Sequence, residues 1–176
     1  MNNTLLKSEE RSATTSSLDQ NTPAGQRGVL LVLDVTKVPG GKAEAEAAVA
    51  AAEAAKAKAV EEEKGVAEAE AALEAAEAAL AAVEATEAGT LTVSLEARDP
   101  ASGKHVPLTA FAVTKKASEL EAGTTLAYTI YPGAAETAAL GSHEVMALAL
   151  PGKWRVKVTH SAGGKWTYTV GASALR

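Results

Sequence analysis

The sequence contains no cysteine and only six aromatic residues among its 176 residues. Without cysteine, disulfides and thiolate chemistry are excluded, and the redox compartment cannot be inferred. No stretch is long and apolar enough to cross a bilayer, and the first residues lack the basic and apolar regions of a secretory signal. We therefore expect a soluble protein without membrane contact, made and used without secretion through a signal peptide.

Motifs that carry catalysis or bind phosphate or metal ions are also missing from the sequence. His105, His143 and His160 lie far apart, form no helical pair and have no cysteine to complete a zinc site. There is no glycine-rich phosphate loop and no Gly-x-Ser-x-Gly elbow. Asp99 precedes a proline and is better explained as a turn residue than as an acid-base partner of Asp34. We expect no enzyme activity, no catalytic residue, no cofactor and no metal site.

The acidic residues are concentrated in one block. Lys42–Glu87 contains twelve Glu and four Lys, a net charge of −8, so the rest of the chain carries +3 of the total of −5. A protein that binds duplex nucleic acid needs a concentrated basic face. Lys115-Lys116 is only a short basic pair, so we expect no direct contact with nucleic acid.

Strand patterns occupy both sides of this block. Gly28–Lys37 is a β-branched apolar run that ends before Pro39-Gly-Gly41, and Thr90–Arg98 alternates apolar and polar residues. Further strands are expected at Val106–Val113, Thr125–Tyr131, Glu144–Leu150, Trp154–His160 and Trp166–Gly171. The last two flank a glycine-rich hairpin loop and should share one buried face. About seven short strands predict a mainly β body, an antiparallel sandwich that is immunoglobulin-like or jelly-roll-like, over residues 28–41 and 88–176.

The block itself, residues 42–87, predicts two helices. Alanine and glutamate are strong helix formers, and Gly65 is the point where a helix would end. One unbroken helix would carry the chain about 70 Å away from the body with no route back, whereas two antiparallel helices of about 35 Å return it to its start. We therefore expect a helical hairpin inserted into the β body.

One stripe of larger side chains runs along the second half of the block: Val66, Leu73, Leu80 and Val83. These residues should support packing within the hairpin or between subunits. Alanine faces allow close approach but bury little apolar area, on the order of one methyl group per position. Two interpretations stay open: the hairpin packs against copies of itself or another chain, or it is a solvated spike.

Residues 1–27 are polar and have no regular periodicity. They are either a disordered tail or an extended N-terminal arm that becomes ordered on a neighbouring subunit, and we adopt the arm. The chain would then have three parts, namely the arm, the β body and the helical hairpin.

Seven segments resemble, in order, small structural proteins of the virions of tailed bacteriophages and prophages. They are Leu5–Ser8, Arg11–Gln20, Arg27–Thr36, Arg98–Lys104, Tyr131–Ala135, Leu150–Val156 and Tyr168–Ala172. The Asp-Pro-Ala-Ser-Gly-Lys turn and the Trp-Arg-Val strand are the more specific parts. The resemblance covers roughly three-quarters of the chain. In that family a short loop stands where this chain has residues 42–87, so the resemblance says nothing about the block.

The resemblance implies a structural protein of the virion, and it supplies no catalytic residue. Combined with the expected architecture, it favours a capsid decoration or minor capsid protein on the capsid exterior, present in the host cytoplasm during assembly. Its partner would be the major capsid protein, and it would be a homo-oligomer on the particle, with a trimer as one candidate. The residues expected to make the attachment are Leu5, Leu6, Arg11 and Leu18 of the arm.

Two other functions stay open. A tail or head-tail connector component would use the same body and arm but assemble into a ring. A carbohydrate-binding module would stack exposed aromatic side chains on sugars, although most of the aromatic residues here fall on strand positions that should face the core.

Overall fold

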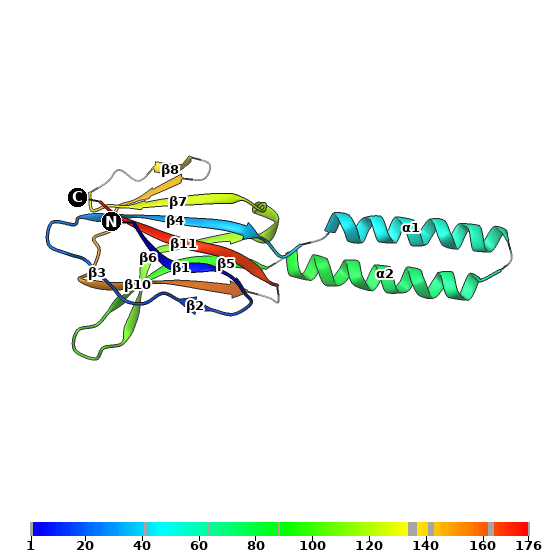
Figure 1. Ribbon diagram of the computed structural model, residues 1–176, viewed down its shortest axis with the longest axis horizontal. Coiled ribbons are helices and arrows are strands. Elements are labelled where there is room, and N and C mark those ends of the chain that lie inside the picture. The colour runs from blue at the N-terminus through cyan, green and yellow to red at the C-terminus, as the bar shows by residue number, and fades with distance from the viewer. Residues whose placement is uncertain are drawn as a thin grey trace.

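The computed structural model describes residues 2–40, 42–62, 64–87, 89–133, 137–140, 143–161 and 164–175. Over these residues the chain is mainly β, with two helices that project from the body as a pair (Figure 1). The strands are β1 (Asn2–Arg11), β2 (Thr15–Ser16), β3 (Gln20–Asn21), β4 (Gly28–Lys37), β5 (Thr90–Arg98), β6 (His105–Lys116), β7 (Thr124–Ile130), β8 (Thr137–Leu140), β9 (His143–Met146), β10 (Lys153–Ser161) and β11 (Trp166–Leu175). The helices are α1 (Lys42–Glu61) and α2 (Val66–Glu87), and a 3-10 turn, η1, covers Ala117–Glu119.

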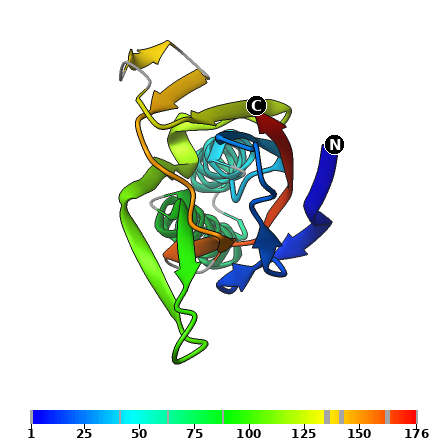
Figure 2. The same ribbon diagram turned by 90° about the vertical axis from the view of Figure 1, so that its left-hand side faces the viewer.

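The strands form two sheets that enclose one hydrophobic core. One sheet has the order β1-β11-β4-β7-β9-β8, and the other has the order β2-β10-β5-β6, with β3 also paired to β10. Within the described residues every pairing is antiparallel except that of β7 with β9. Figure 2 looks along the helices and shows the strands arranged around the core, with both helices behind it.

The apolar side chains at every second position of the strands fill this core. Every second residue of β4, from Val29 to Val35, is at most 1% exposed, and so are Leu91, Val93 and Leu95 of β5. Successive side chains of a strand point to opposite faces, so each strand contributes one apolar face to the space between the sheets. The expected buried faces of residues 154–158 and 166–170 are present, because their alternate residues are at most 2% exposed.

The connection between β10 and β11 differs from the expected hairpin. β10 pairs with β5 and with β2 and β3, whereas β11 pairs with β1 and β4 in the other sheet. The loop therefore crosses from one sheet to the other, and the two buried faces meet across the core. Periodicity shows which face of a strand is apolar, but it carries no information about which strand lies beside it.

The N-terminal segment, expected to be an extended arm that becomes ordered on a neighbouring subunit, pairs here with strands of its own chain. β1 pairs with the edge of β11, and β2 and β3 pair with the edge of β10. Leu6 is 7% exposed and belongs to the core. A strand at the edge of a sheet needs only one pairing partner and few buried side chains, so a polar sequence without clear periodicity can form it.

The alanine-rich block forms two antiparallel helices, as the sequence predicts. Gly65 adopts a φ of 72° between them, a conformation that favours glycine. The Lys64 amide donates to the Ala59 carbonyl at 3.1 Å, which closes α1, and the Ala69 amide donates to the Gly65 carbonyl at 3.0 Å in α2. At about 1.5 Å per residue each helix is about 30 Å long. Among the described residues, no helix is long and apolar enough to cross a membrane.

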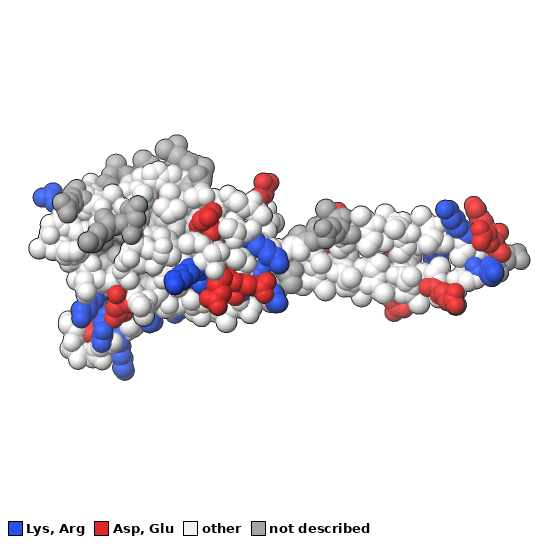
Figure 3. Space-filling model, in the orientation of Figure 1, with Lys and Arg blue, Asp and Glu red and all other residues white. Residues whose placement is uncertain are grey.

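Val66, Leu73, Leu80 and Val83 all lie on the half-buried side of α2, and Val49 lies on the half-buried side of α1. The rest of the visible flank is formed mainly by alanine, with charged side chains gathered at the tip (Figure 3). The expected stripe of larger residues therefore lies where the two helices meet.

Candidate functional site: the Leu18 bend

The segment Thr15–Asn21 runs along the edge of β10. Ser16 is paired with Lys157 and Gln20 with Trp154. Between these pairs, residues 17–19 of the segment lie opposite residues 155–156 of β10, so the N-terminal segment has one residue more than its partner. An extra residue on one strand makes a bulge that turns side chains away from the ladder. We call residues 17–19 the Leu18 bend.

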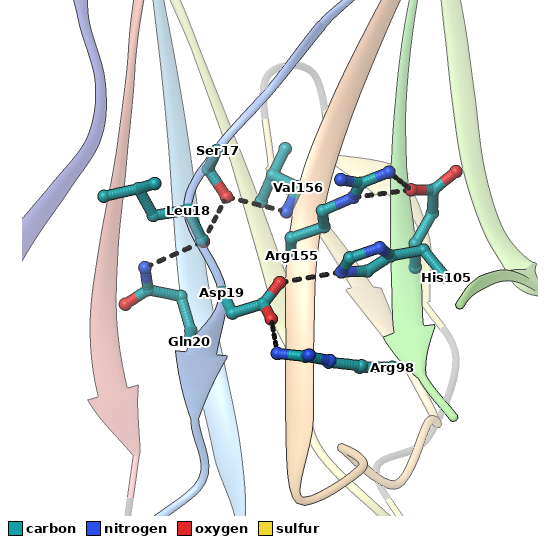
Figure 4. A network of polar contacts seen from close by, with 9 residues as sticks. Ser17, Leu18, Asp19, Gln20, Arg98, His105, Arg155 and Val156 are labelled. Carbon is teal, nitrogen blue, oxygen red and sulfur yellow. Dashed lines mark hydrogen bonds and ion pairs between the residues drawn. The ribbon is translucent and has the colours of Figure 1, made fainter. Parts of the chain in front are cut away.

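Ser17 fixes the first side of the bend. It is 6% exposed, and its amide donates to the Val156 carbonyl at 2.8 Å. The Val156 amide donates in return to the Ser17 Oγ at 3.1 Å, and this hydroxyl donates to the Leu18 carbonyl at 2.9 Å. Two hydrogen bonds thus hold Ser17 to Val156 of β10, and the third, to the Leu18 carbonyl, lies within the bend (Figure 4).

Asp19 fixes the other side of the bend by reaching across to β5 and β6. One carboxylate oxygen lies 2.7 Å from His105 Nε2, and the other accepts from Arg98 Nη1 at 2.9 Å (Figure 4). The hydrogen bond from His105, together with that from Arg98, holds the pKa of Asp19 below its ordinary value. The carboxylate is therefore ionised at neutral pH and tied to two strands.

Leu18, between these two fixed residues, is 84% exposed. Because Ser17 is hydrogen-bonded to β10 and Asp19 to β5 and β6, the backbone on both sides of Leu18 is fixed and keeps its side chain at the surface. The backbone entropy that a flexible loop would lose on binding has already been lost here. The bend thus presents a single large apolar side chain on a pre-ordered support.

An ion triad with a buried carboxylate lies next to the bend on β5 and β10. Glu96 is 4% exposed and accepts from Arg155 Nη2 at 2.6 Å and from Lys157 Nζ at 3.1 Å. Desolvation by itself would raise the pKa of Glu96, but the hydrogen bonds and charges of Arg155 and Lys157 outweigh it and lower the pKa. The triad holds Arg155 beside residues 17–19 (Figure 4).

Arg98, which contacts Asp19, also borders a shallow hollow of about 460 Å³. The hollow is lined by Arg98, Asp99, Pro100, Gly103, Pro151, Gly152 and Lys153. The Asp99 carboxylate accepts from the amides of Ala101 and Ser102 at 3.2 and 3.0 Å, which is the turn role expected for it. These hydrogen bonds, led by that from the Ser102 hydroxyl, lower the pKa of Asp99. The surroundings of the bend therefore combine apolar contact area with charged groups, of which Arg98, Lys153 and Arg155 are basic.

The structure separates the four residues expected to make the attachment. Leu6 lies in the core, and Leu5 packs half-buried against it. Arg11 lies with its guanidinium 4.8 Å from the centre of the Tyr168 ring and donates to the Tyr168 carbonyl at 3.1 Å. Leu6 and Arg11 thus make contacts within the chain, and the expectation that they bind a partner stays a prediction. Leu18 is the member of the four that is displayed to solvent.

Sequence reasoning missed Ser17, Asp19, Arg98 and His105. The sequence carries no signal that would link His105 to Asp19, 86 residues away. The other histidines also have hydrogen-bond partners: His143 Nε2 lies 2.9 Å from Thr129 Oγ1, and His160 Nδ1 lies 2.9 Å from the Ala13 carbonyl. Within the described residues, no three His, Asp or Glu side chains are grouped as a metal ion would require.

No protein-family model matches the chain, and no curated protein matches it in sequence.

Proposed function

We propose that the protein is a structural component of the virion of a tailed bacteriophage, a capsid decoration or minor capsid protein that binds the assembled major capsid protein through the Leu18 bend. The observation that carries the proposal is the display of Leu18, 84% exposed between two fixed neighbours. The order of segments that resembles virion proteins supports the same conclusion.

The chemistry of the bend defines the surface it would bind. Leu18 fits an apolar pocket, and Lys153 of β10 favours a carboxylate near the rim of that pocket, whereas Arg98 and Arg155 are already paired with Asp19 and Glu96. One such contact is weak, but a particle repeats it by symmetry on many copies. Contacts between linked subunits add through effective concentration, so the attachment as a whole is strong.

The architecture suits this role. In this proposal the two sheets are the layers of a β-sandwich, immunoglobulin-like or jelly-roll-like, that lies on the shell. The helical pair leaves the end of the body at which β4 ends and β5 begins (Figure 1). Docking through the bend would leave α1 and α2 free to point away from the shell or to meet those of a neighbouring copy.

The alternative of a tail or head-tail connector component uses the same parts, and closed rings of six or more copies in size-exclusion chromatography would favour it. The carbohydrate-binding alternative has little support from the aromatic residues. Phe111, Tyr128, Trp154, Trp166 and Tyr168 are at most 2% exposed, and Tyr131 is half-buried.

The test is sedimentation of the purified chain with capsid shells from the same source that lack it. The wild-type chain should sediment with the shells, and Leu18→Ser should lose binding. A single anchor contributes about 2 kcal/mol, or roughly thirtyfold in the affinity of one site. Val60→Ser is the matched control, because Val60 is also exposed, at 54%, but lies on α1.

Each outcome decides one question. A wild-type chain that stays in the supernatant contradicts the virion role itself. Wild-type binding that Leu18→Ser leaves unchanged keeps the virion role and removes the bend as the attachment point. In images of decorated shells, a pair of rods about 30 Å long should mark each copy and should vanish when residues 42–87 are replaced by a short glycine-serine loop.

A further inference from the structure

Residues 2–22, which contain β1, β2 and β3, close the same side of both sheets. β1 is the edge strand of one sheet beside β11, and β2 and β3 form the edge of the other sheet beside β10. We call residues 2–22 the N-terminal strap. Within the described residues, nothing pairs with the outer side of the strap, so it could leave either edge without breaking a second ladder.

The strap is held by backbone pairing and by a few side-chain contacts, those of Arg11, Ser17 and Asp19. Of residues 3–22, Leu6 and Ser17 alone are buried. The register between β1 and β11 shifts twice, between Thr4 and Leu6 and again between Leu6 and Glu9, and the Leu18 bend is a third irregularity. Bulges interrupt the ladder, and among residues 3–22 only Leu6 belongs to the hydrophobic core.

Polar groups under the strap lack partners while it is in place. His160 Nδ1 bonds to the Ala13 carbonyl, but His160 Nε2 is buried with no hydrogen-bond partner among the described residues. The same holds for Trp166 Nε1, whose ring lies 6.3 Å from that of His160. A buried polar atom without a partner costs about 1–3 kcal/mol. Lifting the strap would let water reach these atoms, which lowers the free energy of the open state.

The turn at residues 23–26 directs the strap onto the edges of its own chain. The Thr22 amide donates to the Gly152 carbonyl, and the Arg27 amide donates to the Leu175 carbonyl. Between these points the Gln26 amide donates to the Pro23 carbonyl at 3.1 Å, and Gly25 has a φ of 85°. This turn folds the strap back onto its own body. If the turn opened, the same strap would reach outward.

We propose that the N-terminal strap exchanges between two copies of the chain, each strap occupying the β10 and β11 edges of the other copy. A second copy offers every group that the strap uses in its own chain: the ladder of β11, the core site of Leu6, and the Arg98 and His105 side chains for Asp19. Exchange of an identical element is a low-cost route to a closed, symmetric dimer. The inference does not depend on the proposed function. In the exchanged dimer each Leu18 bend would be completed by two chains.

The absence of cysteine from the natural sequence makes a direct test possible. Glu10 on the strap is paired with Thr167 on β11. A Glu10→Cys chain is mixed with a Thr167→Cys chain, incubated under reducing conditions, then oxidised and analysed by mass spectrometry. The disulfide between the two different chains requires a strap of one on the edge of the other. The matched control replaces Thr167→Cys by Glu121→Cys, an exposed position in the loop before β7.

The mixed disulfide should exceed that of the control by about a hundredfold, because paired residues react at an effective concentration near the millimolar range. The double variant Glu10→Cys/Thr167→Cys verifies that the two positions can be bridged. Rapid closure of the disulfide within the double variant, together with a mixed disulfide no more abundant than in the control, would overturn the proposal.

A second variant tests the turn. Deleting Ala24 and Gly25 removes the residues that reverse the chain, so the strap can no longer reach its own edge. The deletion variant should be a dimer in light scattering, with the melting behaviour of a folded protein. A folded monomer would show that the strap docks on its own body without this turn and would contradict the exchange. If the variant does not fold, the mixing experiment decides.

Discussion

Asp19 and His105 are 86 residues apart in the chain, yet their side chains meet at 2.7 Å. This contact, with the one from Arg98 to the same carboxylate, joins a polar N-terminal segment to β5 and β6, which lie beyond β10 in the same sheet. It also sets the position of Leu18. The first prediction tests this relationship.

Asp19→Asn removes the charge that His105 and Arg98 share. We expect faster amide hydrogen exchange at residues 17–20, by about tenfold, with little change elsewhere in the body. Asp34→Asn is the control, because Asp34 accepts a hydrogen bond from Thr125 on the other sheet. Unchanged exchange at residues 17–20 would show that Ser17 alone holds the bend.

Glu96→Gln should lower stability by about 2 kcal/mol at neutral pH, since hydrogen bonds to charged groups contribute about 1.5–3 kcal/mol. The pKa of Glu96 is lowered in the folded state, as is that of Asp19. Their contribution is therefore fully present above the ordinary carboxyl values near 4 and is lost as pH falls through the folded values. In urea unfolding, the free energy of unfolding of the wild type should fall in this acidic range, and that of Glu96→Gln should fall less. Parallel curves would contradict the role of the triad.

His160 should add a second loss of stability on acidification, in a pH range above that of Glu96 and Asp19. Its pKa is lowered first by desolvation and also by the charge of Arg11, against a hydrogen bond to the Ala13 carbonyl that raises it. Its ring faces Arg11 on β1 and the rings of Trp166 and Tyr168 on β11. Since the unfolded chain binds the proton more readily, stability falls as pH drops below the ordinary value near 6.5.

Thermal melts between pH 8 and pH 5 would show this loss as a falling melting temperature. His160→Gln keeps a donor for the Ala13 carbonyl but does not titrate, so its melting temperature should be flat across that interval. A wild-type curve as flat as that of the variant would contradict the assignment.

Gly28→Ala tests the close approach of β4 to β7. A Cβ at Gly28 would overlap the Ile130 carbonyl oxygen and lie 2.8 Å from a ring carbon of Tyr131. Because a backbone atom must move, we expect a loss of about 1–3 kcal/mol, typical of overpacking. Gly152→Ala is the matched control, since its Cβ would meet no atom within 4 Å. Equal stability of the two variants in urea unfolding would contradict the packing of this corner.

The parts of the fold that the sequence predicts have periodic patterns of their own. The apolar alternation of residues 29–35 and 91–95 marks strands because it repeats at the period of a sheet, and the alanine-rich block is broken where Gly65 stands. β1, β2 and β3 have no such pattern, because residues 3–22 together bury only one leucine and one serine. A polar segment that pairs at an edge therefore looks like a tail in sequence.

The candidate site was hidden for a related reason. Leu18 could be named from the sequence because it is an apolar residue in a polar segment. Its support could not, because Ser17 binds Val156, and Asp19 binds Arg98 and His105, over separations of 79 to 139 residues. No spacing rule joins such residues. Their proximity follows from the order of strands, which depends on the packing of the whole core.

The helical insertion has a practical consequence for engineering. The end of β4 and the start of β5 lie close together on the surface of the β body, and residues 42–87 connect them (Figure 1). Any folded domain whose two ends lie close together could be inserted between β4 and β5 in place of α1 and α2, without any rearrangement of the strands of the β body.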